Sequence, residues 1–150
     1  MDLYGGHAVI SIGHSHPHFV RKISRQLKKI GFYSNAIQNP LQSQLASTIG
    51  EHSRLYEFEL FLCSTGAEAI ENALKLSSFH TGRKKVIAFR GAFHGRTSAA
   101  VAVTDSKAIN APLNSQHEVT FLPFNDIDKL EKELAKQTYC AVIFESIQGV

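Results

Sequence analysis

The spacing of apolar residues predicts two amphipathic helices in the first third of the chain. Between residues 17 and 30, apolar side chains recur every three or four positions, and basic side chains fill the positions between them. Pro17 suits the first turn of such a helix and Gly31 suits its end. A second helix is expected from Asn39-Pro40 onward, because asparagine caps helices well and proline fits the first turn. The segment before them, Gly5–Gly13, is short and rich in β-forming residues.

After residue 57, short apolar runs alternate with amphipathic segments. The runs are too short for helices and predict buried strands at Phe58–Cys63, Val86–Phe89, Val119–Leu122 and Cys140–Phe144. The segments between them predict helices at Ala67–Phe79, Thr97–Val103 and Asp126–Ala135, the last capped by Asn125 or Asp126. Alternating strands and helices are typical of an α/β fold, here a mainly parallel sheet flanked by helices on both faces.

The last predicted strand lies close to the end of the chain, and no helix follows it. An open parallel sheet that ended there would leave an edge uncovered. We therefore expect the chain to be a piece of a larger protein.

Composition and charge exclude several classes of protein. The chain is 43% hydrophobic, which supports a packed core, and its net charge of +3 is too small for a polybasic nucleic-acid arm. The longest apolar runs fall far short of the roughly 20 residues that span a membrane. Met1–Gly6 lacks the features of a secretion signal, so we expect a cytoplasmic protein. The unpaired spacing of Cys63 and Cys140 predicts buried free thiols, as in a reducing compartment.

Ligands of parallel α/β sheets gather beyond the carboxyl ends of the strands, which directs attention to three turns. The first, Ser64–Ala67, opens a predicted helix. Thr65 and Glu68 fit a capping box, and Gly66 allows a close backbone approach. Free amides at such a helix start bind phosphate, although an ordinary capped helix is the simpler interpretation of this turn alone.

The second and third turns carry aromatic, basic and acidic side chains. In the second, Gly91–Thr97, Phe93 can stack on a planar ring and Arg96 can bind a carboxylate through two donors; a core phenylalanine and a surface arginine are the alternative. In the third, Glu145 directly follows an apolar strand, where a carboxylate must be paired or solvated. Gln148 adds a neutral hydrogen-bonding group.

Three alternating histidines, His14, His16 and His18, form a fourth candidate site. Such a pattern suggests a metal site, but Pro17 interrupts the strand geometry that would align them. No cysteine or carboxylate joins them locally, so we expect turn histidines and no metal.

Together the three turns resemble, in order and spacing, the signatures of class III aminotransferases of the ornithine and acetylornithine type. Gly5–Val9, Gly13–Pro17 and Tyr33-Ser34-Asn35 look like that family too, and the resemblance covers essentially the whole chain. The FHGRT run is most similar to the acetylornithine branch. Two positions depart from the family: Ser146 replaces the usual proline, and Val150 stands where many members carry glutamate.

The resemblance implies part of the large domain of a type I aminotransferase that depends on pyridoxal 5'-phosphate (PLP). Residues 1–50 would be an N-terminal segment with two helices, and residues 51–150 the first part of the PLP-binding large domain. The remainder of that domain and the C-terminal small domain would be absent. A homodimer that shares its active sites between subunits is implied as well.

The resemblance also assigns roles to particular residues. The implied cofactor-binding residues are Thr65, Gly66 and Ala67 at the phosphate, Phe93 and His94 at the ring, and Glu145 as a polar neighbour. Arg96 would bind the substrate carboxylate, and Tyr33 and His7 would lie in the substrate pocket. The lysine that forms a Schiff base with the cofactor would lie beyond Val150. No catalytic residue is therefore assigned, and the chain alone is expected to be inactive.

The implied reaction moves the δ-amino group of N-acetyl- or N-succinylornithine to 2-oxoglutarate in arginine biosynthesis. The alternatives within the class are an ornithine, 4-aminobutyrate or other ω-amine transaminase, or an aminomutase relative. A non-catalytic α/β binding domain is the alternative from a different class.

Overall fold

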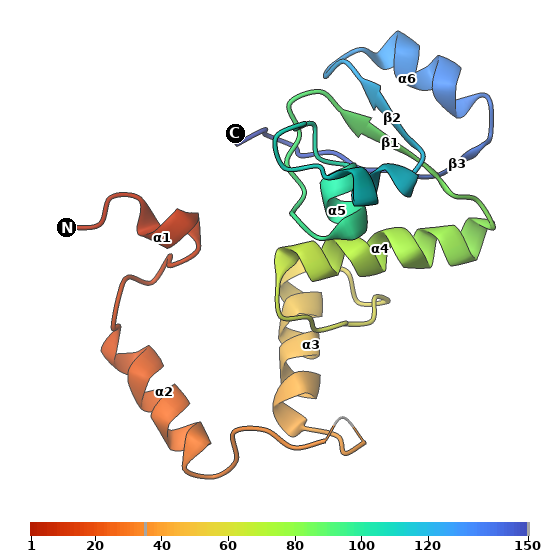
Figure 1. Ribbon diagram of the computed structural model, residues 1–150. Helices are drawn as coiled ribbons and strands as arrows, with labels where there is room; N and C mark the ends of the chain where they lie inside the picture. Colours follow the sequence, from red (N-terminus) through yellow and green to blue (C-terminus); the bar gives the residue numbers. More distant parts are fainter. Residues whose placement is uncertain (35, 150) are drawn as a thin grey trace. The chain divides into compact units, whose positions relative to one another are not determined.

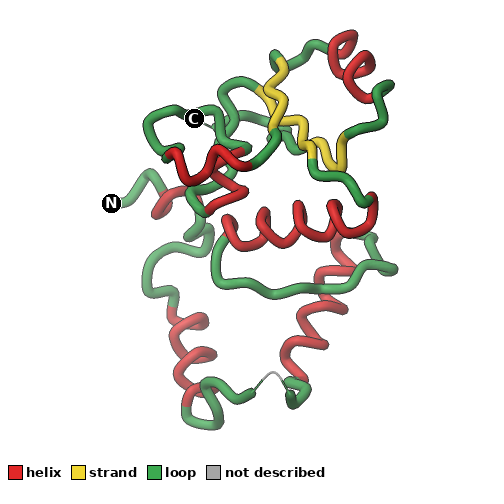
Figure 2. Tube along the Cα trace, turned by 45° about the vertical axis from the view of Figure 1, so that its right-hand side comes forward, coloured by secondary structure: helices red, strands yellow, loops and turns green. Residues whose placement is uncertain are grey.

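The computed structural model describes residues 1–34 and 36–149 of the chain (Figures 1 and 2). Asn35, part of a family-like motif, and Val150, one of the two departures from the family, therefore lie outside the described residues. The chain divides into two compact units, Met1–Leu60 and Phe61–Val150, which we describe separately.

The described residues of the first unit form three helices: α1 (Gly5–Ala8), α2 (Pro17–Leu27) and α3 (Pro40–Ser53) (Figure 1). Both helices predicted from the apolar spacing are confirmed. The Asn39 side chain caps α3 by accepting a hydrogen bond from the amide of Leu41 at 3.0 Å. No residue of the three helices is buried, so the apolar side of α2 is exposed within the described structure.

The predicted β structure at Gly5–Gly13 is wrong, because α1 occupies this segment as a single left-handed turn. All four residues of α1, from Gly5 to Ala8, have positive φ angles. Two adjacent glycines allow this conformation at little cost. The Asp2 carboxylate stabilises it by accepting hydrogen bonds from the amides of Tyr4, Gly5 and Gly6.

The second unit contains the sheet and its helices. Its elements are α4 (Gly66–Thr81), β1 (Lys85–Phe89), α5 (Ser98–Ala102), the 3-10 helix η1 (Pro112–Gln116), β2 (Val119–Leu122), α6 (Ile127–Leu134) and β3 (Tyr139–Val142). The helix predictions and three of the four strand predictions are confirmed to within a few residues. The side chain of Asp126, not Asn125, caps α6 through the amide of Lys129. The 3-10 helix was not expected.

The sheet has the strand order β2-β1-β3, and both strand pairs are parallel. Val86 and Ala88 of β1 face one side, where they pack in the core with Leu74 of α4 and with Val103, which directly follows α5. The alternate residues of β1 face the other side, where Leu130 of α6 packs. Figures 1 and 2 show α4 and α6 on opposite sides of the strands. This arrangement confirms the predicted α/β class.

The predicted strand at Phe58–Cys63 is wrong. The segment forms no strand, and Phe58 and Phe61 are 73% and 67% exposed. A strand needs a neighbouring strand for its backbone hydrogen bonds, and no described residue pairs with this segment. An apolar run can show that a strand is favourable, but not that its partner is present.

The two thiols also differ from expectation. Cys63 is exposed, so the prediction that it is buried is wrong, whereas Cys140 is half-buried in β3. Burial raises the pKa of the Cys140 thiol. No helix within residues 1–34 and 36–149 has the length and apolar character needed to cross a membrane.

Candidate functional site

The first turn of α4 presents unused hydrogen-bond donors. A capping box closes this end: the Thr65 hydroxyl accepts from the amide of Glu68 at 3.1 Å, and the Glu68 carboxylate accepts from the amide of Thr65 at 3.2 Å. The next two amides, of Gly66 and Ala67, have no acceptor among the described residues. Nothing lies within 4 Å of the Cβ position of Gly66. The start of α4 therefore presents two free amides and a threonine hydroxyl that can still donate, with open space at Gly66. Such an arrangement can bind an anion.

The turn after β1 rests directly on this end of α4. Gly95 has a φ of +137°, and a Cβ built there would lie 2.8 Å from the Cβ of Ala67 and 3.0 Å from the Cβ of Ala100. Only glycine allows so close an approach in this backbone conformation. The contact brings the second predicted turn to the first.

Two residues that the sequence analysis did not identify, Thr104 and Asp105, hold the turn after β1 through hydrogen bonds. Thr104 is buried, and its hydroxyl accepts a hydrogen bond from the amide of His94 at 2.9 Å. The hydroxyl proton is directed at the carbonyls of Gly95 and Ala100, at 3.2 and 2.9 Å. The Asp105 carboxylate accepts from the amide of Gly91 at 3.0 Å. In the sequence, the only sign of their role was that Thr104 and Asp105 form a polar pair directly after the apolar run Ala99–Val103.

We expect Thr104→Val to destabilise the protein by about 1–3 kcal/mol, because it leaves the buried amide of His94 without an acceptor. Thr104→Ser keeps the hydroxyl and loses only a methyl group, which costs about 0.8 kcal/mol. Urea unfolding of the two variants measures the difference. Equal stability of the valine and serine variants would contradict the bracing role.

The third turn, after β3, joins the second through two contacts. The Glu145 carboxylate accepts a hydrogen bond from the amide of Phe93 at 3.3 Å. The Gln148 side-chain amide donates to the carbonyl oxygen of Arg90 at 2.8 Å. Glu145 is thus half-buried and paired, as its position after an apolar strand requires.

Phe93 and Arg96 meet at the front of the second turn. The Arg96 guanidinium lies over the Phe93 ring, 5.4 Å from its centroid. Phe93 is half-buried and Arg96 is exposed, so the guanidinium keeps its donors available for a ligand.

His94, next to Phe93, is buried with an unused ring nitrogen. Its Nε2 has no hydrogen-bond partner among the described residues. Burial lowers the pKa of His94, and the nearby Glu145 carboxylate opposes that shift. A buried, neutral imidazole with a free nitrogen can donate to or accept from a ligand without bringing a charge into the site.

We expect an NMR titration of His94 to give a pKa below its ordinary value of about 6.5. Glu145→Gln should lower that pKa further, because it removes the negative charge that favours the imidazolium. Since the folded protein binds this proton less readily than the unfolded chain, acidification below about pH 6.5 reduces the unfolding free energy. Glu118→Gln, at the amino end of β2, is the matched control and should leave the His94 titration unchanged. A His94 pKa at or above the ordinary value would contradict the expectation.

The remaining candidates lie in the first unit. His7 is part of α1, where its ring packs edge-on against Tyr4 with centroids 5.0 Å apart. Tyr33 follows α2 and is exposed. His14 pairs with Asp2 at 2.7 Å, and no three metal-ligating side chains gather anywhere in the described parts of the chain.

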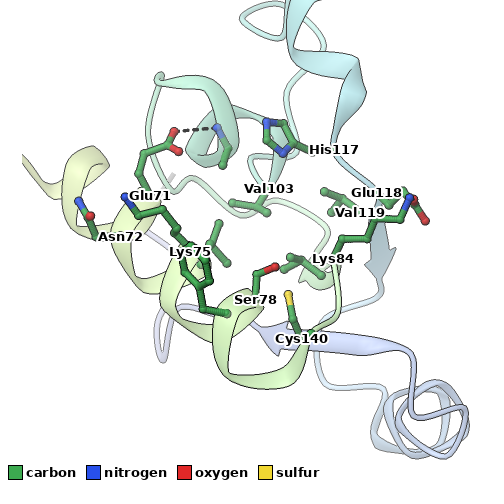
Figure 3. Close-up of a pocket in the computed structure, with 15 residues that line it drawn as sticks. Glu71, Asn72, Lys75, Ser78, Lys84, Val103, His117, Glu118, Val119 and Cys140 are labelled. Atoms are coloured by element: carbon green, nitrogen blue, oxygen red, sulfur yellow. Dashed lines mark hydrogen bonds and ion pairs between the residues drawn. The ribbon is translucent and has the colours of Figure 1, made fainter.

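A groove of about 710 Å³ lies elsewhere in the second unit (Figure 3). Its floor includes Val86, Val119 and Cys140, which lie toward the amino ends of the three strands. None of the predicted site residues lines it. Because ligands of parallel sheets bind at the carboxyl ends, we place the candidate site at the three turns.

The three turns together offer a defined set of interactions. The start of α4 suits a phosphate, Phe93 suits a planar ring, and Arg96 suits a carboxylate. Glu145 and His94 add one charged and one neutral polar group beside the ring position. None of the three turns carries a lysine, so they supply no amine nucleophile.

Comparison with known proteins gives a consistent family. The model of the family described as "Aminotransferase class-III" matches residues 1–150. The chain is 40% identical to an acetylornithine aminotransferase of Archaeoglobus fulgidus, over 99% of this chain and 39% of that protein. It is 36% identical to a LysW-aminoadipate semialdehyde/glutamate semialdehyde transaminase of Sulfurisphaera tokodaii, over 99% of this chain and 38% of that protein.

A solved structure shows the same fold. An amine transaminase from an uncultivated Pseudomonas species, crystallised in a PLP-bound form, aligns with a TM-score of 0.85 at 23% identity. The alignment covers 99% of this chain and 40% of that one. The likeness confirms the predicted partial aminotransferase fold. The chain spans 38–39% of the length of the two relatives named above.

Proposed function

The chain belongs to the class-III aminotransferase family, and from this membership we propose that it forms the cofactor-binding part of a PLP-dependent transaminase. The observation that carries the proposal is the convergence of three turns that are distant in sequence. The Gly95–Ala67 contact joins the first two turns, and the Phe93–Glu145 hydrogen bond joins the last two.

The start of α4 fits the phosphate of PLP. The amides of Gly66 and Ala67 and the hydroxyl of Thr65 are free to donate to phosphate oxygens. The open space at Gly66 leaves room for the group, and the helix dipole favours its negative charge.

The second and third turns fit the pyridine ring. Phe93 would stack on it, and the unpartnered Nε2 of His94 would gain a hydrogen-bonding partner. Glu145 would hold the Phe93 backbone in place and contribute a negative charge beside the ring. When bound, PLP supplies the electron sink that allows the substrate carbon to exchange its amino group.

Arg96 would bind the carboxylate of the amino-acid substrate and so orient the amine toward the cofactor. We propose N-acetyl- or N-succinylornithine as the amino donor and 2-oxoglutarate as the acceptor. The 40% identity to the Archaeoglobus acetylornithine aminotransferase supports this choice. Arginine biosynthesis, the homodimer and the cytoplasmic location stay predictions that go with it.

A second candidate is transamination of a related δ- or ε-amine, as the name of the Sulfurisphaera relative indicates, with ornithine and 4-aminobutyrate as further donors to be compared. All these substrates present a terminal amine several bonds from a carboxylate or its derivative. The three turns suit that chemistry without distinguishing its members.

The test uses the full-length protein that contains these residues. We expect it to bind PLP with a visible absorbance band and to transfer amino groups fastest from N-acetylornithine or N-succinylornithine, compared with ornithine and 4-aminobutyrate. Borohydride reduction should attach the cofactor to a lysine outside residues 1–150. A label on a lysine within these residues, or the absence of any spectral change with amino donors, would refute the proposal.

A further inference from the structure

Glu71, one and a half turns into α4, makes a contact that the cofactor site does not explain. Its Oε1 accepts hydrogen bonds from the amides of Ala99 and Ala100 at 2.7 and 3.1 Å. Figure 3 shows one of them as a dashed line from the Glu71 carboxylate. These amides belong to the first turn of α5, 28 and 29 residues later in the chain. The N-cap residue of α5, Thr97, makes no side-chain cap of its own. Glu71 therefore supplies the missing cap from another helix.

The cap matters because α5 is short. It has five residues, and an isolated helix of that length is not stable in water. Packing of Ala100, Val101 and Ala102 in the core and the Glu71 carboxylate hold it in place. Glu71 forms no ion pair within the described residues, so the amides at the start of α5 are its partners.

Two contacts from one face of α4 lie on either side of Arg96 along the chain. Ala67 and Glu71 are four residues apart and therefore lie on the same side of the helix. Ala67 packs against Gly95, immediately before Arg96, and Glu71 binds the amide of Ala99, three residues after it. The helix that offers the phosphate seat thus also fixes the backbone on both sides of Arg96.

We propose that Glu71 is a positioning residue that sets the place of Arg96 relative to the phosphate-binding end of α4. The inference rests on the proposed function, because it assigns Arg96 to the substrate carboxylate. Loss of the Glu71 carboxylate frees the start of α5 and lets Arg96 move, while the phosphate-binding amides of Gly66 and Ala67 stay in place. Binding of the substrate carboxylate is then weakened more than binding of the cofactor.

The test compares Glu71→Ala, Glu71→Gln and Lys75→Ala in the full-length protein loaded with PLP. Lys75 is the matched control, since it lies one turn further along α4 and lines the same groove without a described contact to α5. The donors are N-acetylornithine and N-acetyl-1,4-diaminobutane, which carries the same reacting amine without the carboxylate. The first half-reaction is followed through the absorbance of the cofactor.

We expect Glu71→Ala to reduce the ratio of the rate with N-acetylornithine to the rate with N-acetyl-1,4-diaminobutane by up to about 100-fold, the loss that a misplacement of about 1 Å can cause. The PLP dissociation constant should change less than about twofold. Glu71→Gln keeps an oxygen acceptor and should recover most of the preference, and Lys75→Ala should match the wild type. In the cofactor-free protein, hydrogen exchange at Ala99 and Ala100 should become faster in Glu71→Ala only.

Two results would overturn the inference. One is an equal loss with both donors together with loss of PLP, which marks a purely structural residue. The other is a donor preference in Glu71→Ala that equals that of Lys75→Ala. If Glu71→Ala fails to fold, the same comparison is made with Glu71→Gln, whose preference must then fall measurably below that of Lys75→Ala. A wild-type protein that binds no PLP would refute the proposed function instead, and the hydrogen-exchange result would still decide the role of the cap.

Discussion

Arg96→Ala is expected to lower kcat/KM for N-acetylornithine by about 100- to 1000-fold. The exposed guanidinium can form two charge-assisted hydrogen bonds to a carboxylate, and losing them costs about 3–4 kcal/mol, with each 1.36 kcal/mol worth roughly tenfold in rate. PLP binding should persist, because Arg96 is not part of the phosphate seat. Arg96→Lys keeps the charge but loses the two-pronged geometry, so its kcat/KM should lie between those of the wild type and Arg96→Ala. Steady-state kinetics and the absorbance of bound PLP measure both effects.

Arg90→Ala is the matched control for this experiment. Arg90 is another exposed arginine, directly before the same turn, and its guanidinium also lies 5.4 Å from an aromatic centroid, that of Phe121. Its ion pair with Asp105 is solvent-exposed and worth about 0–1 kcal/mol. We expect kcat/KM to change less than about threefold. An Arg96→Ala effect no larger than this would show that Arg96 does not bind the substrate.

Gly95→Ala is expected to destabilise the protein by about 2–4 kcal/mol, through overpacking and an unfavourable backbone conformation. The new Cβ would lie 2.8 Å from the Cβ of Ala67, and the φ angle of +137° disfavours any side chain. The substitution also forces the second turn away from the start of α4. PLP affinity should therefore fall together with stability, as urea unfolding and cofactor titration would measure.

Gly82→Ala separates the two causes. Gly82 ends α4 with a φ angle of +66°, and nothing lies within 4 Å of its Cβ position. It therefore reports backbone strain alone, about 1–2 kcal/mol, with no effect on the cofactor. If Gly95→Ala costs no more than Gly82→Ala and leaves PLP affinity unchanged, the close contact between the two turns is not what assembles the site.

Helices α2 to α6 were predictable because their signals are local, whereas α1 and the 3-10 helix η1 were not predicted. The Asn39-Pro40 start of α3 and the capping box at Thr65 are each read within a few residues, and the structure contains both. The three confirmed strands were recognisable as apolar runs between polar boundaries. Phe58–Cys63 carries the same pattern and forms no strand, since strand formation depends on a partner elsewhere in the chain.

The same distinction applies to the residues of the candidate site. Gly66, Phe93 and Glu145 could be identified from the sequence because of their positions in the turns. Glu71, Thr104 and Asp105 could not be identified, because a carboxylate in the middle of a helix or a threonine after an apolar run has many possible partners. The backbone amides that bind these three side chains lie 10 to 29 residues away along the chain, at distances in sequence where local patterns carry no information.

Short-range chemistry along this chain thus specifies helices α2 to α6, the apolar runs that can form strands, the residues of the three turns and their likeness to one family. Folding adds the encounters between segments: Gly95 against Ala67, Phe93 with Glu145, and the Glu71 carboxylate on the start of α5. The reason is that caps and hydrophobic periodicity act within one or two turns of backbone. Close packing and shared hydrogen bonds depend on which segments the parallel sheet brings to its carboxyl edge.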